Sequence, residues 1–147
     1  MATLIAVSNL NANITPIVSN DQISENHQIV VEVKEPSNIE MIEVLAEKYG
    51  VDSNLALHIS QCESELRQYN ENGTVLRGRE NPQDVGLFQI NEFYHLQDSQ
   101  KLGFNIYTAK GNIEYAMYIM ERDGTRHWTY SKPCWGKRVG SQIALAK

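Results

Sequence analysis

The chain reads QCES at residues 61–64 and, about twenty residues later, DVGLFQIN at residues 84–91. The first segment lies at the end of a stretch, residues 55–66, in which apolar side chains recur at helical spacing. This pattern predicts an amphipathic helix, with Glu63 beside the apolar stripe and near the carboxyl end. The second segment contains a glycine turn followed by Gln-Ile-Asn. We expect the two segments to face each other, and their order and spacing decide the fold.

Capping and stop signals place helices around these two segments. Ser37 and Glu40 form a capping box, in which the Ser hydroxyl accepts from a free backbone N–H and the Glu reaches back. The helix that follows is expected to end at Gly50, and Asp52 or Ser53 is expected to cap the next one. The other expected elements are a long loop over residues 69–83, helices over residues 92–102 and 111–122, and a helix end at Gly124.

Length and composition are those of one ordinary globular domain. The chain has 147 residues, of which 41% are hydrophobic and 21% are charged, so it can bury one core but not two. We divide it into a linker or extended segment at residues 1–37, a helical domain at residues 38–135 and a basic tail at residues 136–147. Alternating apolar positions at residues 29–33 give the linker one strand-like stretch. An added strand or a partner-binding arm is the alternative interpretation.

The charge and the apolar runs argue against two classes of partner. A net charge of −5 argues against DNA or RNA, because phosphate binding needs a surplus of Lys and Arg. No apolar run approaches the roughly 18 residues that cross a bilayer, so we expect no integral membrane segment. Residues 1–10 are apolar but too short and too uncharged for a secretory signal, so no signal sequence is evident in this chain.

Glu63 is the principal candidate for chemistry. A glycosidic bond breaks when its leaving oxygen receives a proton while positive charge develops on the sugar ring. The acid that supplies this proton must stay protonated near neutral pH, which an apolar setting favours. The apolar stripe, the negative end of the helix dipole and Trp128 as a candidate wall all predict a raised pKa for Glu63. A single glutamate on a helix, like Glu65 or Glu71, ordinarily has a structural role. The surrounding motifs therefore decide whether Glu63 is a candidate for catalysis.

That pattern resembles the lysozyme-like superfamily, and within it the soluble lytic transglycosylase domain. Three motifs carry the resemblance: YGVD at residues 49–52 before the helix of Glu63-Ser64, GLFQIN at residues 86–91, which is similar to the family's Gly-Leu-Met-Gln-Ile element, and Asn112-Ile113 of a later helix. The C-terminal part up to Cys134 also resembles animal-type lysozymes. The resemblance covers residues 38–135. One departure is residues 81–84, which replace the family's Ser-x-x-Gly-Ala loop, so substrate contacts there are not carried over.

The resemblance implies a mainly α, lysozyme-like α+β fold, in which a helical domain bears a catalytic cleft and a short strand or turn element. It implies cleavage of the bond between N-acetylmuramic acid and N-acetylglucosamine in the glycan strands of peptidoglycan. Glu63 would act first as acid and then as base, with neither metal nor organic cofactor. We therefore expect a monomer of bacterial or phage origin that works outside the cytoplasm, in the periplasm, in the cell wall or as a secreted protein.

Asp84 separates this mechanism from the alternative of hydrolysis. In animal-type lysozymes an Asp at the matching place, two residues before Gly86, is the nucleophile or charge stabiliser, so a hydrolysing lysozyme would use Glu63 and Asp84 together. Without a direct role, Asp84 would cap the turn before Gly86 by side-chain to backbone bonds. A non-catalytic glycan-binding or structural module on the same scaffold is the third possibility, and a shielded Glu63 argues against it.

Six further residues are candidates for contact with substrate. Gln89 and Asn91 can form hydrogen bonds with acetamido groups or order the cleft. Ser64 corresponds to the serine that, in the family, follows the catalytic glutamate and supports the fold around it. At least one of the two tyrosines is expected to pack in the core with its hydroxyl at the surface. Trp128 is the candidate wall beside Glu63. The six candidates are Ser64, Gln89, Asn91, Tyr115, Tyr118 and Trp128.

Cys62 and Cys134 permit one disulfide, which would tie the helix of Glu63 to the C-terminal segment. Closing a loop of about seventy residues stabilises the fold by about 4 kcal/mol. An exported enzyme favours this bridge, and two buried thiols are the alternative. We expect no metal site, because His58 and Cys62 at helical spacing lack a second ligand pair. A hydrolase that uses Cys62 with His95 or His127 lacks a family signature around the cysteine.

Overall fold

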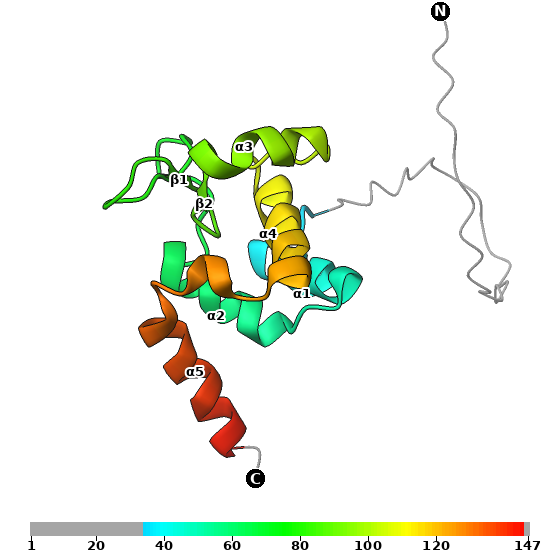
Figure 1. Cartoon of the computed structure of the whole chain (residues 1–147), viewed down its shortest axis with the longest axis vertical. Helices are drawn as coiled ribbons and strands as arrows, with labels where there is room; N and C mark the ends of the chain where they lie inside the picture. The colour runs from blue at the N-terminus through cyan, green and yellow to red at the C-terminus, as the bar shows by residue number, and fades with distance from the viewer. Residues whose placement is uncertain (1–33, 146–147) are drawn as a thin grey trace, which may run out of the picture. The chain divides into compact units, whose positions relative to one another are not determined.

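The structure, a computed structural model, describes residues 34–145. These residues form a mainly helical domain with one small antiparallel sheet (Figure 1). None of the helices described is long and apolar enough to cross a bilayer. The strand-like stretch expected at residues 29–33 lies outside the described residues. The elements are α1 (Asn38–Tyr49), α2 (Ser53–Ser64), β1 (Asp84–Val85), β2 (Ile90–Asn91), α3 (Glu92–Lys101), α4 (Ala109–Asp123), the 3-10 helix η1 (Arg126–Trp128) and α5 (Lys132–Leu145).

The helix ends that the sequence predicts are confirmed. Ser37 and Glu40 form both bonds of the capping box at the start of α1, and Gly50 ends the helix in the left-handed conformation. The Asp52 side chain accepts from two backbone N–H groups at the start of α2. α4 begins slightly earlier than expected because the Thr108 side chain caps it. Local sequence thus determines where these helices begin and end.

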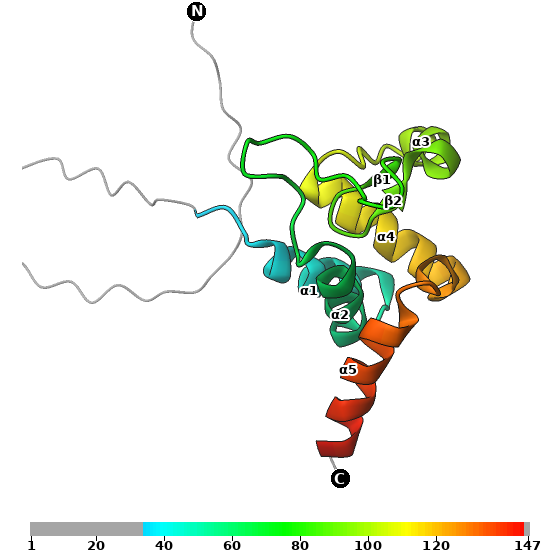
Figure 2. The ribbon, with the colours of Figure 1, turned by 90° about the vertical axis from the view of Figure 1, so that its left-hand side faces the viewer.

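Helices α1, α2 and α4 pack around a shared apolar core. α1 contacts both α2 and α4, and α2 also contacts α5; Figure 2 shows α1 and α2 side by side. Each helix turns its apolar stripe inward, which is the arrangement that the spacing predicts. The fully buried residues of this core include Ile42, Ile59, Ile113, Met117 and Ile119.

The small sheet and α3 lie on one side of this helical core (Figures 1 and 2). β1 and β2 pair in antiparallel register, with Asp84 opposite Asn91 and Val85 opposite Ile90. Residues 86–89 form the turn between the strands, and the apolar side chains of Leu87 and Phe88 are fully buried. A two-stranded unit of this size is unstable alone, so its conformation depends on the helices beneath it.

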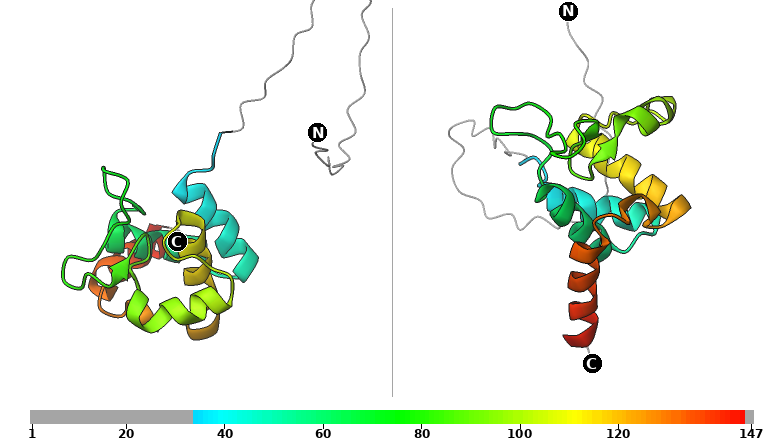
Figure 3. Two further views of the ribbon diagram at one scale, coloured as in Figure 1. Left: turned by 90° about the horizontal axis from the view of Figure 1, so that it is seen from above. Right: turned by 60° about the vertical axis from the view of Figure 1, so that its left-hand side comes forward.

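α5 begins beside the helical core and extends away from it (Figures 1 and 3). A disulfide between Cys62 and Cys134 joins α2 to α5, and this confirms the expected bridge. The indole of Trp135 is buried and donates to the Trp128 carbonyl at 3.0 Å. We expected a tail from Gly136 onward, whereas α5 continues through this position to Leu145. The anchored first turn provides a nucleus from which the helix extends.

Candidate active site

Side chains from distant segments hold the turn between β1 and β2. The backbone N–H of Leu87 donates to Gln68 Oε1 at 3.0 Å. The Leu87 carbonyl accepts from Ser64 Oγ at 2.8 Å and from Ser60 Oγ at 3.2 Å. All three polar side chains are buried. Because buried backbone groups need hydrogen-bond partners, these bonds fix the turn against the end of α2.

The next residue of the turn, Phe88, is bound in the same way from α4 and η1. Its N–H donates to Asn112 Oδ1 at 2.9 Å, and its carbonyl accepts from the Trp128 indole at 2.9 Å. The Asn112 amide also donates to the carbonyls of Val85 and Ile106, each at 2.9 Å. Asn112 is fully buried, so its amide acts as an internal connection between the turn, α4 and the loop before α4.

Gly86 occupies the one point of the turn that leaves no room for a side chain. Its φ is +72°, a left-handed value that glycine adopts without strain. A Cβ atom there would lie 2.3 Å from Gln68 Oε1 and 2.7 Å from Asn112 Nδ2. The glycine of the GLFQIN segment is therefore required both by backbone conformation and by the buried amides beside it.

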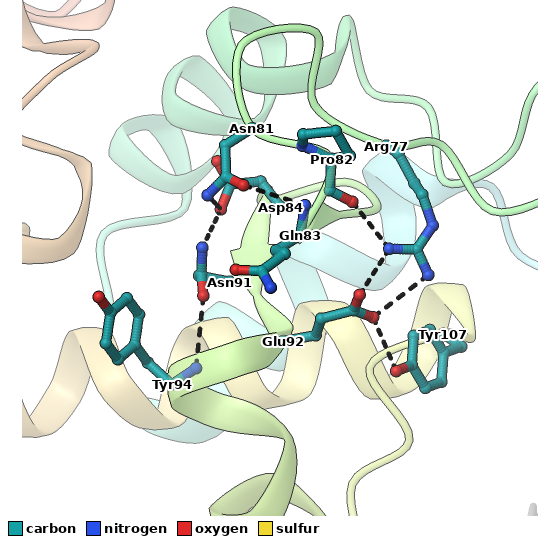
Figure 4. Close-up of polar contacts among 9 residues, drawn as sticks. All are labelled: Arg77, Asn81, Pro82, Gln83, Asp84, Asn91, Glu92, Tyr94 and Tyr107. Atoms are coloured by element: carbon teal, nitrogen blue, oxygen red, sulfur yellow. Dashed lines mark hydrogen bonds and ion pairs between the residues drawn. The ribbon is translucent and has the colours of Figure 1, made fainter.

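Asp84 and Asn91 face each other across the strand pair (Figure 4). Asp84 Oδ1 accepts from Asn91 Nδ2 at 2.7 Å and from Asn81 Nδ2 at 3.2 Å. The Asn91 oxygen accepts from the Tyr94 backbone N–H at 3.3 Å and so caps α3. The expected capping bonds from Asp84 to the turn backbone are replaced by these side-chain bonds. Asp84 is thus held by two amides.

The long loop before β1 is tied to α3 by a second polar group (Figure 4). Arg77 binds the Glu92 carboxylate through two nitrogens, at 2.7 and 3.2 Å, and donates to the Pro82 carbonyl at 2.7 Å. The Tyr107 hydroxyl donates to the same carboxylate at 2.8 Å. A bidentate guanidinium pair fixes geometry as well as distance. The loop residues around Asp84 therefore have a defined position relative to α3.

A cavity of about 460 Å³ is lined by the end of α2, the β1–β2 unit, the start of α3, α4 and η1. Three carboxyl residues, three amide residues and a tryptophan line this concave surface, which combines apolar walls with a few convergent polar groups. Five residues that the sequence singled out line it: Glu63, Asp84, Gln89, Asn91 and Trp128. The fold brings them together from positions up to 65 residues apart.

A second, smaller hollow of about 270 Å³ adjoins Glu63. Glu63 and Gln89 line both hollows. Three arginines, Arg67, Arg77 and Arg79, also line the smaller one. Glu63 therefore borders two concave regions.

The environment of Glu63 favours its protonated form. Burial raises the pKa of this carboxyl, because desolvation penalises the charged state, and the nearby Asp84 carboxylate acts in the same direction. A hydrogen bond with the Ser131 side chain opposes both effects, but the net direction is upward. An acid with a raised pKa at the wall of a cavity is suited to donate a proton.

Three of the predicted contact residues do not line the main cavity. Ser64 is buried beneath the turn, where its hydroxyl bonds the Leu87 carbonyl, so its role is to support the fold around Glu63. Tyr115 is buried in the core, and its ring stacks with that of Tyr118. Both tyrosines lie on the part of α4 that faces α3 and the core, because residues three apart share one side of a helix.

Sequence patterns missed several residues that line the main cavity. His95 follows Asn91 by one helical turn, and this spacing alone would have placed it on the same side of α3. Tyr94 and Tyr130 line the cavity with their side chains 73% and 97% exposed, which is unusual for large aromatic rings. No local signal marks Tyr130 or its neighbour Ser131, because their position depends on how η1 packs.

The geometry gives no support to a metal centre. Among residues 34–145, no group of three His, Cys, Asp or Glu side chains is arranged to hold a metal ion. The one pair at ligand spacing, His58 and Cys62, is interrupted because the Cys62 sulfur forms the disulfide. The same bridge leaves no thiol for a Cys–His hydrolase, since neither cysteine is free.

No model of a known protein family matches this chain, and no curated protein or solved structure has a significant match to it. An assignment of function therefore depends on the geometry and chemistry of the cavity, together with the motifs in the sequence.

Proposed function

We propose that this protein is a lytic transglycosylase with a lysozyme-like fold, which cleaves the β-1,4 bond between N-acetylmuramic acid and N-acetylglucosamine in peptidoglycan. The observation that carries the proposal is Glu63, a half-buried carboxyl with a raised pKa that borders two hollows. A surface glutamate has no need of such a setting. An acid that must keep its proton near neutral pH does.

The buried bonds of the turn support the same assignment. The motifs that resemble the transglycosylase domain, GLFQIN at residues 86–91 and Asn112-Ile113, meet in space, and Asn112 bonds Phe88 directly. Gly86 has the conformation and the close neighbours that require glycine. The motifs thus share a structural role, because together they hold the turn that places Gln89 on the wall of the cavity that Glu63 also lines.

The two hollows fit a polymeric substrate. A glycan strand that extended through both would place one glycosidic bond next to Glu63. The acid would protonate the bridging oxygen while the bond from the muramic acid C1 to that oxygen breaks. The resulting carboxylate would then take the proton of the 6-hydroxyl of the same sugar, whose oxygen bonds C1. The products are a free 4-hydroxyl on one fragment and a 1,6-anhydro end on the other.

Hydrolysis by Glu63 and Asp84 is the second candidate. The observation in its favour is that both carboxyl groups line one cavity and that the charge of Asp84 acts on Glu63. In this alternative a water supplies the new oxygen at C1, so the product carries a reducing end. Mass spectrometry of digested peptidoglycan separates the two reactions: anhydro ends support transglycosylation, and reducing ends support hydrolysis.

Replacement of the acid tests whether the protein is an enzyme at all. Glu63→Gln is expected to abolish the clearing of a peptidoglycan suspension, because the amide cannot donate the proton, while folding and saccharide binding persist. Glu71→Gln is the matched control, since Glu71 is exposed and lines neither hollow. If the wild-type protein binds glycan without cleaving it, the scaffold serves as a binding module. If the Glu63 variant still clears the suspension, another group is the acid.

The disulfide supports a site of action outside the cytoplasm. Bridges such as Cys62–Cys134 form and persist in oxidising compartments and are rare where cellular reductants keep thiols reduced. Peptidoglycan lies in the same kind of compartment, so the bridge and the proposed substrate agree.

A further inference from the structure

His95 lies in a defined ring cluster on the wall of the main cavity. Its Nδ1 atom is 3.0 Å from the Tyr115 hydroxyl. Its ring makes edge contacts with the Tyr115 ring at 5.6 Å and with the His127 ring at 5.1 Å, measured between centroids. Both histidines line the cavity that contains Glu63. The ring orientation of His95 is therefore fixed from two sides.

The hydrogen bond with Tyr115 determines which nitrogen of His95 carries a proton. Tyr115 is only 1% exposed, and burial, followed by the charge of Asp98, raises the pKa of its phenol, so the hydroxyl keeps its proton. Among the described residues, His95 Nδ1 is the only hydrogen-bond partner of this hydroxyl. A buried donor without an acceptor is costly, so the hydroxyl donates to Nδ1. In a neutral imidazole the proton then resides on Nε2.

The surroundings of His95 favour its neutral form. Burial lowers the pKa of this imidazole, and the neighbouring His127 and Arg122 side chains act in the same direction, while Asp98 and Asp123 oppose it. Asp123 is occupied elsewhere, because its carboxylate binds His127 at 2.9 Å and is paired with two arginines. His95 is thus an uncharged donor rather than a cation.

We propose that His95 is a substrate-binding residue whose Nε2–H donates to the acetamido carbonyl oxygen of a bound amino sugar, and that Tyr115 is the positioning residue that sets this tautomer. This assignment rests on the proposed function and adds a recognition element to it. Tyr115 then contributes to substrate binding from the core, without reaching the cavity itself.

The chemistry of the cavity selects an acetamido carbonyl over a charged group. An amide carbonyl is a pure acceptor and matches a neutral N–H donor, whereas a carboxylate binds best to a cation. Glu80 and Asp84 also line this cavity, and their negative charges disfavour an anionic ligand there. Arg67, Arg77 and Arg79 line the smaller hollow instead. The main cavity therefore fits a neutral N-acetylated sugar ring.

The first measurement is made on the free, full-length protein. Long-range ¹H–¹⁵N NMR spectra report each histidine tautomer, and the His95 signals are assigned from their loss in His95→Gln. We expect a protonated Nε2 and an unprotonated Nδ1 at neutral pH. Tyr115→Phe is expected to remove this preference, whereas Tyr118→Phe, a change on the same helix away from His95, leaves it intact. A protonated Nδ1 in the wild-type protein overturns the assignment.

The second measurement titrates oligosaccharides into the Glu63→Gln protein, which cannot cleave them. N,N′,N″,N‴-tetraacetylchitotetraose is expected to bind, and adding His95→Phe is expected to weaken it about tenfold, the loss of roughly one net hydrogen bond. His95→Gln retains an N–H donor and restores most of the affinity. Cellotetraose, which lacks acetamido groups, is expected to be insensitive to either change. Equal affinity of the His95→Phe and parent proteins for the chitin oligomer overturns the inference.

These readouts separate the inference from the proposed function. If peptidoglycan is not cleaved but His95→Phe still weakens binding of the chitin oligomer, the sugar contact stands and the enzymatic assignment fails. If peptidoglycan is cleaved through Glu63 and the chitin oligomer binds independently of His95, the enzymatic assignment stands and the His95 contact is refuted.

Discussion

Glu63 and Asp84, two of the three carboxyl residues that line the cavity, are positioned in different ways. Glu63 lies in the last turn of α2, and the sequence neighbours that form that helix determine its place. Asp84 lies on a strand of two residues, whose position depends on buried amides and hydroxyls from other segments. Their immediate surroundings also differ: Glu63 is largely desolvated, with one bond to Ser131, whereas Asp84 accepts from two amides.

The comparison teaches that a single cavity can give two similar side chains separate roles. Burial raises the pKa of Glu63, whereas two amides donate to a carboxylate oxygen of Asp84. Pairs of acidic groups with contrasting surroundings are a common means of dividing acid and base roles. The contrast predicts that substitutions in the β1–β2 wall and substitutions in the α2 wall change stability and the pH dependence of activity in different ways.

The largest effect is expected at Gly86 on the β1–β2 wall. Gly86→Ala imposes a left-handed φ on alanine and forces Cβ against the amides of Gln68 and Asn112, at a cost of about 3–5 kcal/mol in unfolding free energy. Chemical denaturation measures this loss. Gly103→Ala is the matched control, because Gly103 has a similar φ of +83° and no neighbour within 4 Å. Equal losses in the two variants would mean that the buried amides do not hold the turn.

The second-largest effect is expected when the disulfide that anchors α2 is removed. Replacing Cys62 and Cys134 together by Ser opens a loop of 72 residues and is expected to lower the unfolding free energy by about 4 kcal/mol. The reason is that the unfolded chain gains conformational freedom. Comparison of the oxidised and reduced wild-type protein by denaturant titration provides an independent measure. A stability that is insensitive to reductant would contradict the prediction.

Asp84→Asn sharpens the comparison of the two carboxyl groups. Removing the negative charge relieves one cause of the raised Glu63 pKa, so the pKa falls and the alkaline limb of the pH–activity profile moves to lower pH. Under transglycosylation the maximal rate is expected to change by less than about tenfold, whereas loss of a nucleophile costs on the order of 10²-fold or more. Asn81→Ala, which removes one donor to Asp84 but keeps its charge, is the control.

The smallest effect is expected at Ser131. Its hydrogen bond lowers the pKa of Glu63, so Ser131→Ala raises that pKa further, and the alkaline limb moves to higher pH. Ser131→Thr keeps the hydroxyl and is expected to behave like the wild-type protein. Rates of peptidoglycan cleavage across a pH series provide the test. A shift in the acidic direction would show that Ser131 does not stabilise the carboxylate.

The sequence predicted the helical half of the site well, because its determinants are local. The capping box at Ser37, the stops at Gly50 and Gly124, and the place of Glu63 near the end of α2 all follow from residues within a few positions. Two cysteines permitted a single pairing, but the sequence left open whether they are bonded, and the structure contains the bridge. Short-range hydrogen bonds and helical periodicity can be recognised from the amino-acid sequence alone.

The sequence could not separate residues that line the cavity from residues that support it. Ser64, Tyr115 and Tyr118 carry polar groups at plausible positions, yet they lie beneath or beside the cavity wall. Conversely, Tyr130 and Ser131 reach the cavity from an unremarkable stretch. A helical spacing fixes which residues share a face, but the direction of that face depends on the neighbours it packs against.

The sequence by itself determined where the helices begin and end, because caps and periodicity depend on nearby residues, and its motifs singled out Glu63 as the candidate acid. Only the tertiary structure decided that the turn at Gly86 is held by Gln68 and Asn112, that partial burial raises the pKa of Glu63, and that His95 lines the same cavity. These features arise where segments distant in the chain exclude solvent together, and desolvation is a property of the assembled fold.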